Sequence, residues 1–128
     1  MGVTIDFAHV LYADEMPACA VALAARSLKL FGVHLNDGYA KRDDRLMLGT
    51  VHPVQTMKLI FVLEAISYDR SIYFDTFPDT TGINPAAECS ANIATVEAIS
   101  AQIGKNVDLL RFGLERFKDL AIQQKGDF

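Results

Sequence analysis

The chain has 128 residues, of which 51% are hydrophobic and 22% charged, and its formal net charge is −4. This composition is typical of one soluble globular domain with a packed core and excludes a disordered chain. The acidic balance leaves no basic stripe for a phosphate backbone, and no apolar run approaches the ~20 residues needed to cross a bilayer, so we expect neither nucleic acid nor membrane as a partner.

Along the chain, a short apolar strand, a polar loop and a longer segment with helical periodicity follow one another three times. Prolines mark the expected helix starts, because proline is favourable at the first helical position. The expected strands cover residues 2–9, 29–36 and 71–77, the expected helices cover residues 17–28, 53–67 and 85–103, and an amphipathic helix follows at about 107–124. Strands separated by full-length helices pair in parallel through right-handed crossovers, which predicts a single α/β domain over residues 1–128.

Each expected strand carries one ionisable residue near its carboxyl end, namely Asp6, His34 and Asp75. A buried parallel strand is normally a continuous run of Val, Ile and Leu, and a carboxylate in it costs roughly several kcal/mol unless it is paired, hydrogen-bonded or bound to metal. In parallel α/β folds the functional site lies at the carboxyl ends of the strands. One imidazole and two carboxylates at this edge, with His9 following Asp6, predict a divalent-metal site.

Each of these residues also has an ordinary structural interpretation. A single histidine at a strand end is commonly a core or surface residue, and a single aspartate there is commonly a helix or loop cap. The repetition in successive units favours a shared site over these alternatives. Asp43 and Asp44 belong to the charged run Lys41–Arg45, for which spacing alone predicts a solvated loop.

The chain resembles the carboxyl-terminal part of the xylose-isomerase-like (β/α)8-barrel sugar isomerases, especially the L-rhamnose isomerase branch, in the stretches "DFAH", "HLNDGYAKRDDRLMLGTVHP" and "YFDTFPDTTGINPAAECSANI". The resemblance covers about Val3 to Ile103 and implies that the three βα units correspond to the last strands of a TIM barrel. Such a barrel needs about 250 residues, so a carboxyl-terminal fragment or a truncated relative is expected.

The resemblance also implies roles for individual residues. The structural metal that binds substrate would be held by Asp6, His34 and Asp75, and the second, catalytic metal would be held by His9 and Asp43. Close relatives have a further acid two residues after the position of Asp43, where this chain has Arg45, and Asp44 is the available substitute. The implied cofactor is Mn²⁺ first, with Co²⁺, Mg²⁺ or Zn²⁺ as alternatives.

The implied activity is the interconversion of an aldose and its ketose, in which bound cations hold neighbouring oxygens and polarise the carbonyl. Asn36, Asp37 and His52 are candidate sugar contacts or supports for the metal ligands, and Asp37 is equally a candidate cap. Two alternatives stay open: a non-catalytic remnant or assembly subunit that keeps the fold and one metal, and a sugar epimerase of the same barrel superfamily. A flavodoxin-like or receiver-like domain is disfavoured, because the sequence has no Gly-rich phosphate loop.

The expected partners follow from the incomplete barrel. Three strands leave two unpaired edges and a bare inward face, which predicts a homo-oligomer or a complementary amino-terminal barrel fragment, besides a small sugar substrate.

Cys19 and Cys89 lie far apart inside expected helices, which favours reduced, buried thiols over a disulfide. Together with the absence of a signal-peptide pattern, this predicts a cytoplasmic protein.

Overall fold

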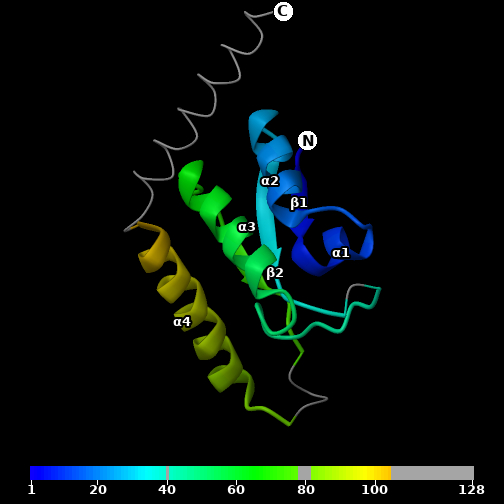
Figure 1. Ribbon diagram of the computed structural model, residues 1–128, viewed down its shortest axis with the longest axis vertical. Helices are drawn as coiled ribbons and strands as arrows, with labels where there is room; N and C mark the ends of the chain where they lie inside the picture. The colour runs from blue at the N-terminus through cyan, green and yellow to red at the C-terminus, as the bar shows by residue number, and fades with distance from the viewer. Residues whose placement is uncertain (40, 78–81, 105–128) are drawn as a thin grey trace, which may run out of the picture.

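The computed structural model describes residues 1–39, 41–77 and 82–104, in which each strand is followed by one or two helices (Figure 1). In chain order the elements are β1 Val3–Asp6, α1 Phe7–Tyr12, α2 Pro17–Arg26, β2 Leu30–Leu35, α3 Pro53–Ala65, β3 Ile72–Phe74 and α4 Pro85–Gly104. The helix expected at about 107–124 lies outside the described residues.

The sheet is parallel, with its three strands in the order β1-β2-β3. The register pairs Asp6 with His34 and His34 with Tyr73, so the ends of the strands lie side by side. The α/β class and the parallel pairing are therefore confirmed for the described part of the chain. Assignment of these strands to the end of a TIM barrel stays a prediction.

Helices cover one face of the sheet. In Figure 1, α2 and α3 lie side by side in front of β2, and α4 lies beside α3. Val33 and Leu35 of β2 are fully buried against this layer, together with Val21 of α2 and Leu59 of α3. Because burying one such side chain contributes about 1.5–3 kcal/mol, this interface holds the helices on the sheet.

The other face of the sheet is open within the described ranges. Side chains alternate along a strand, so the residues between the buried ones point away from the helices. On this face Thr4 and Tyr73 are exposed, while Gly32 and His34 are half-buried. The fold thus leaves the carboxyl ends of the strands accessible from one side.

Three expectations about local structure were wrong. The strand expected over residues 71–77 covers only Ile72–Phe74, because β2 ends at Leu35 and the N–H of Phe77 donates to the loop carbonyl of Arg45 instead. The strand expected to reach His9 ends at Asp6, because the Asp6 carboxylate caps α1 by accepting the backbone N–H of His9 at 3.1 Å. Cys19 and Cys89 are free, as expected, but exposed rather than buried, because they lie on the outer faces of α2 and α4.

None of the helices in the described ranges has both the length and the apolar character that a bilayer crossing requires.

Candidate metal centre

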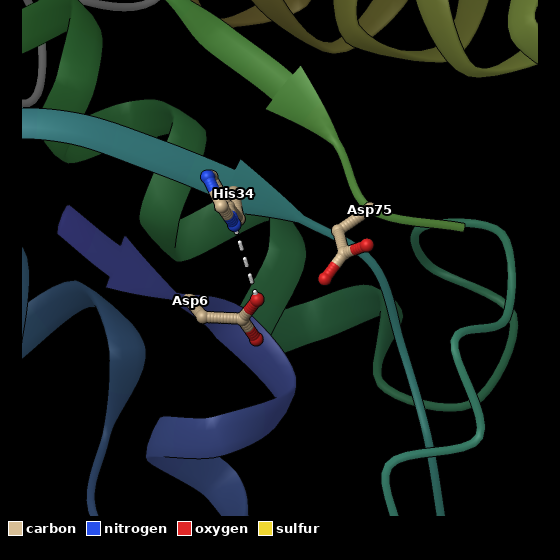
Figure 2. A group of neighbouring side chains, drawn as sticks. All are labelled: Asp6, His34 and Asp75. Carbon is tan, nitrogen blue, oxygen red and sulfur yellow. Dashed lines mark ion pairs between the residues drawn. The ribbon is translucent and has the colours of Figure 1, made fainter.

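The predicted ligands of the first metal come together at the carboxyl edge of the sheet. Figure 2 shows Asp6, His34 and Asp75 extending toward one another from the ends of successive strands. One donor atom from each residue can be chosen so that all of them lie within 4.8 Å of one another. His34 Nδ1 is 3.5 Å from Asp6 Oδ2. The structure therefore assembles the group that the strand positions predicted, and the role of these residues as ligands stays a prediction.

Asp6 is held in place by a buried amide. Asn36 Nδ2 donates to Oδ1 and Oδ2 of Asp6 at 3.2 and 3.4 Å, and Asn36 Oδ1 accepts the backbone N–H of Ala8 at 2.9 Å. The side chain of Asp6 is only 9% exposed. A buried carboxylate with such fixed donors has little freedom to reorient, so Asp6 presents its oxygens to His34 in one direction.

Asp75 and His34 are oriented by their neighbours in the sheet. Asp75 lies one residue beyond β3, and its backbone N–H donates to the carbonyl of Leu35 at 3.2 Å, which continues the strand pairing. The His34 ring lies 5.2 Å from the ring of Tyr73, centre to centre, at an angle of 45°. These contacts fix the backbone of Asp75 and one side of the His34 ring at the carboxyl edge of the sheet.

His9 and Asp43, the predicted ligands of the second metal, form a pair beside this group. His9 Nε2 lies 3.0 Å from Asp43 Oδ2 and joins α1 to the loop after β2. An open hollow of about 400 Å³ is lined by His9, Tyr12 and Asp43. The hydrogen bond to Asp43 raises the pKa of His9 above its ordinary value of 6.5; partial burial opposes this, and the charges of Asp6, Asp43 and Asp75 add to it.

We expect the imidazole of His9 to titrate above pH 6.5 in metal-free protein, and Asp43→Asn to return its pKa toward that value. A pH titration of the histidine ring signals by NMR measures both. Because the pKa is raised in the folded state, the pair stabilises the fold below pH 6.5, and this contribution is lost as the pH rises through the raised pKa. Asp14→Asn is the control, because Asp14 pairs with Lys41 instead. An unchanged His9 titration in Asp43→Asn would contradict the assignment.

Arg45 lies between the two groups. Its Nε is 3.4 Å from Asp43 Oδ2, and its Nη1 is 3.8 Å from Asp75 Oδ1. The sequence marked Arg45 only as a departure from the resembled pattern, and nothing in local spacing indicated that it reaches Asp75. The structure thus adds one basic residue to the site.

Asp37 fastens the loop that carries Asp43 and Arg45. Its Oδ1 accepts the N–H of Gly38 at 2.8 Å and faces His52 Nδ1 at 2.7 Å, and its Oδ2 accepts the N–H groups of Val51 and His52 at 2.9 and 2.8 Å. The backbone of Asp37 also pairs with Leu46. The two ends of the loop are therefore tied to one carboxylate.

These positions bear on the predicted substrate contacts. Asn36 is 1% exposed and Asp37 is fully buried, and the side chain of His52 is 20% exposed with Nδ1 directed at Asp37. Of the roles that the sequence left open, the hydrogen bonds of Asn36 and Asp37 favour support of Asp6 and of the loop. Contact of these three residues with a sugar stays a prediction.

A larger hollow, of about 470 Å³, opens at the opposite end of the sheet and is lined in part by Leu30, Tyr68 and Arg70. Its lining contains no histidine or cysteine and a single carboxylate, Asp69. Divalent-metal or acid–base chemistry needs a denser set of donors. The carboxyl edge of the sheet is therefore the better candidate site.

No family model matches the chain, and no curated protein is significantly similar to it. The functional assignment therefore depends on the residues and their geometry.

Proposed function

We propose that the chain forms the cation-binding part of a divalent-metal-dependent sugar isomerase that interconverts an aldose and its ketose. The observation that carries this proposal is the convergence of Asp6, His34 and Asp75 at the carboxyl edge of a parallel sheet. Two carboxylates and one imidazole suit Mn²⁺, Co²⁺, Mg²⁺ or Zn²⁺. Ligand atoms at about 2.0–2.4 Å from one ion are at most about twice that distance apart, and the 4.8 Å spread of the donor atoms fits this limit.

The bound cation would supply polarisation of the substrate carbonyl and would hold adjacent sugar oxygens. Asp6, His34 and Asp75 would hold the cation, and Asn36 would keep the Asp6 carboxylate turned toward it. His9 is the group best suited to move a proton, because its side chain is 60% exposed, lies beside the site and is paired with a carboxylate through Nε2, which leaves Nδ1 for a substrate. In this proposal Asp43 positions the His9 ring and stabilises its protonated form.

The open face of the sheet supports a proposal about partners. Within the described residues, Tyr73 is 62% exposed and the side chain of His34 is 37% exposed, although the strands that flank an active site normally bury such positions. We propose that a second copy of the chain, or a complementary barrel segment, covers this face.

The net charge of −4 supports neither nucleic acid nor an anionic surface as a partner. The two free cysteines support a reducing compartment such as the cytoplasm.

The exposure of the site also favours a second candidate function, a non-catalytic subunit that keeps one cation site. Catalysis by orientation and electrostatic stabilisation needs a site closed to water, and each of these effects is worth roughly 10²–10³-fold or more in rate. The two candidates share the cation site and differ in whether a sugar binds to the cation, and in whether the sugar is converted once a partner closes the site.

A relaxation experiment tests the isomerase proposal. The chain is stripped with a chelator and loaded with Mn²⁺, and the relaxation rate of water protons is measured while L-rhamnose or another aldose is added. Bound Mn²⁺ enhances the relaxation of water protons, and we expect the aldose to lower this enhancement, because sugar oxygens displace water from the ion. We also expect the isolated chain to produce negligible ketose.

The His34→Gln chain is the control, because it should show neither the Mn²⁺ enhancement nor the sugar effect. Bound Mn²⁺ that no aldose or ketose affects would contradict the isomerase proposal and favour the non-catalytic subunit. Epimerised aldose or ketose among the products would indicate the epimerase alternative. Light scattering on the same samples reports whether the chain associates.

A further inference from the structure

The guanidinium of Arg45 occupies the space between two carboxylates of the candidate site. Both carboxylates lie within ion-pair distance: Nε of Arg45 is 3.4 Å from Oδ2 of Asp43, and Nη1 is 3.8 Å from Oδ1 of Asp75. Its Cζ also lies 4.2 Å from the centre of the Phe77 ring. A planar guanidinium is well suited to a position flanked by carboxylates and an aromatic face, because it can meet both kinds of partner at once.

The backbone around Arg45 directs the side chain to this place. Arg45 has a φ of 52°, a left-handed conformation that is uncommon for a residue with a side chain. Its carbonyl accepts the N–H of Phe77 at 3.0 Å, and the next residue, Leu46, exchanges backbone hydrogen bonds with Asp37. The backbone is therefore fixed at Arg45 and at the residue that follows it, which restricts where the guanidinium can lie.

Arg45 competes with any second cation at this site. The oxygen of Asp43 that Arg45 approaches, Oδ2, is also the oxygen that contacts His9 Nε2 at 3.0 Å. A metal held by His9 and by this oxygen of Asp43 would have to displace Arg45, and a metal on either oxygen of Asp43 would meet the positive charge of Arg45 at short range. Arginine keeps that charge at every physiological pH, so the repulsion is permanent.

We propose that Arg45 limits this site to one divalent cation, held by Asp6, His34 and Asp75, and itself supplies the positive charge beside Asp43. This inference rests on the proposed cation site. It makes Arg45 a specificity-determining residue, because the charge at position 45 decides how many metal ions the chain binds. Removing that charge and adding an oxygen ligand, as in Arg45→Asp, should open a second site between His9, Asp43 and residue 45.

Metal stoichiometry tests the inference with Mn²⁺ as the probe. Equilibrium dialysis against increasing Mn²⁺, followed by metal analysis, should give one ion per wild-type chain and two per Arg45→Asp chain. Two Mn²⁺ ions at neighbouring sites couple magnetically, so the electron paramagnetic resonance spectrum of Arg45→Asp should broaden as the second ion binds. Arg42→Gln is the matched control, because it removes an arginine of the same loop that pairs with Asp44, and it should stay at one ion.

The outcomes separate this inference from the proposed function. Two ions per wild-type chain would overturn the role of Arg45 and leave the cation site standing. One ion in Arg45→Asp, with unchanged circular dichroism, would overturn it as well. No bound Mn²⁺ in the wild-type chain would overturn the proposed function itself. Arg45→Gln, which only removes the charge, should also bind a second ion, more weakly, and it provides the decisive variant if Arg45→Asp does not fold.

Discussion

Asp75→Asn and His34→Gln should each weaken Mn²⁺ binding by about 100-fold or more. Loss of a residue that merely supports a ligand costs about 10–100-fold in metal affinity, and loss of a ligand itself should cost at least the upper end of this range. Both side chains are partly exposed and neither caps a helix, so their loss should leave the fold intact. Titration calorimetry, or the free Mn²⁺ signal in electron paramagnetic resonance, measures the affinity.

Asp69→Asn is the matched control for this experiment. It makes the same change in net charge as Asp75→Asn, and Asp69 is an exposed residue at the opposite end of β3. We expect its effect on Mn²⁺ affinity to be small, because exposed charges far from the ion are screened by salt. If Asp69→Asn and Asp75→Asn weakened Mn²⁺ binding equally, net charge alone would explain the attraction of the metal. This result would contradict a cation site formed by Asp6, His34 and Asp75.

Asp37→Asn should lower the free energy of unfolding by about 3 kcal/mol or more. Each oxygen of the buried Asp37 carboxylate meets two nitrogens, Gly38 N and His52 Nδ1 on one side and Val51 N and His52 N on the other. Whichever way an asparagine amide turns, its NH₂ group faces at least one backbone N–H and leaves that donor without an acceptor. Urea unfolding followed by circular dichroism gives the midpoint and the slope from which this difference is calculated.

Asp44→Asn, in the same loop, provides the comparison for Asp37→Asn. Asp44 accepts one backbone N–H, from Tyr39 at 2.9 Å, and pairs with the exposed Arg42. Its loss should cost about 1 kcal/mol or less. Similar losses in the two variants would show that the Asp37 carboxylate does not fasten the loop as its four contacts indicate.

The regular elements could be predicted from the sequence because their signals are local. Helices begin at Pro17, Pro53 and Pro85, as the prolines and the apolar periodicity predicted. Long helices between apolar runs predicted parallel strands, and the register confirms them. The carboxyl ends of neighbouring parallel strands meet at one edge, so the meeting of Asp6, His34 and Asp75 followed from their positions at the ends of those strands.

Contacts between distant segments decided the remainder. The sequence "DFAH" continues the apolar pattern of the first strand, yet that strand ends at Asp6. The Asp6 carboxylate caps α1 and also accepts a hydrogen bond from the Asn36 amide just after β2, 30 residues away in the sequence. The exposure of Cys19 was also decided in this way, because the face that α2 buries depends on its neighbours in the fold. Periodicity describes a segment by itself and contains no information on such partners.

The sequence by itself therefore determined the α/β class, the parallel pairing of the strands and the edge at which ionisable groups gather, because these depend on local patterns and on the alternation of strands with helices. Only the tertiary structure decided how the loop after β2 meets that edge. Arg45 lies in a left-handed conformation between carboxylates from two segments, and Asp37 holds both ends of its loop. A loop has no periodicity, and its path is set by the hydrogen bonds and charges it meets after the strands and helices have packed.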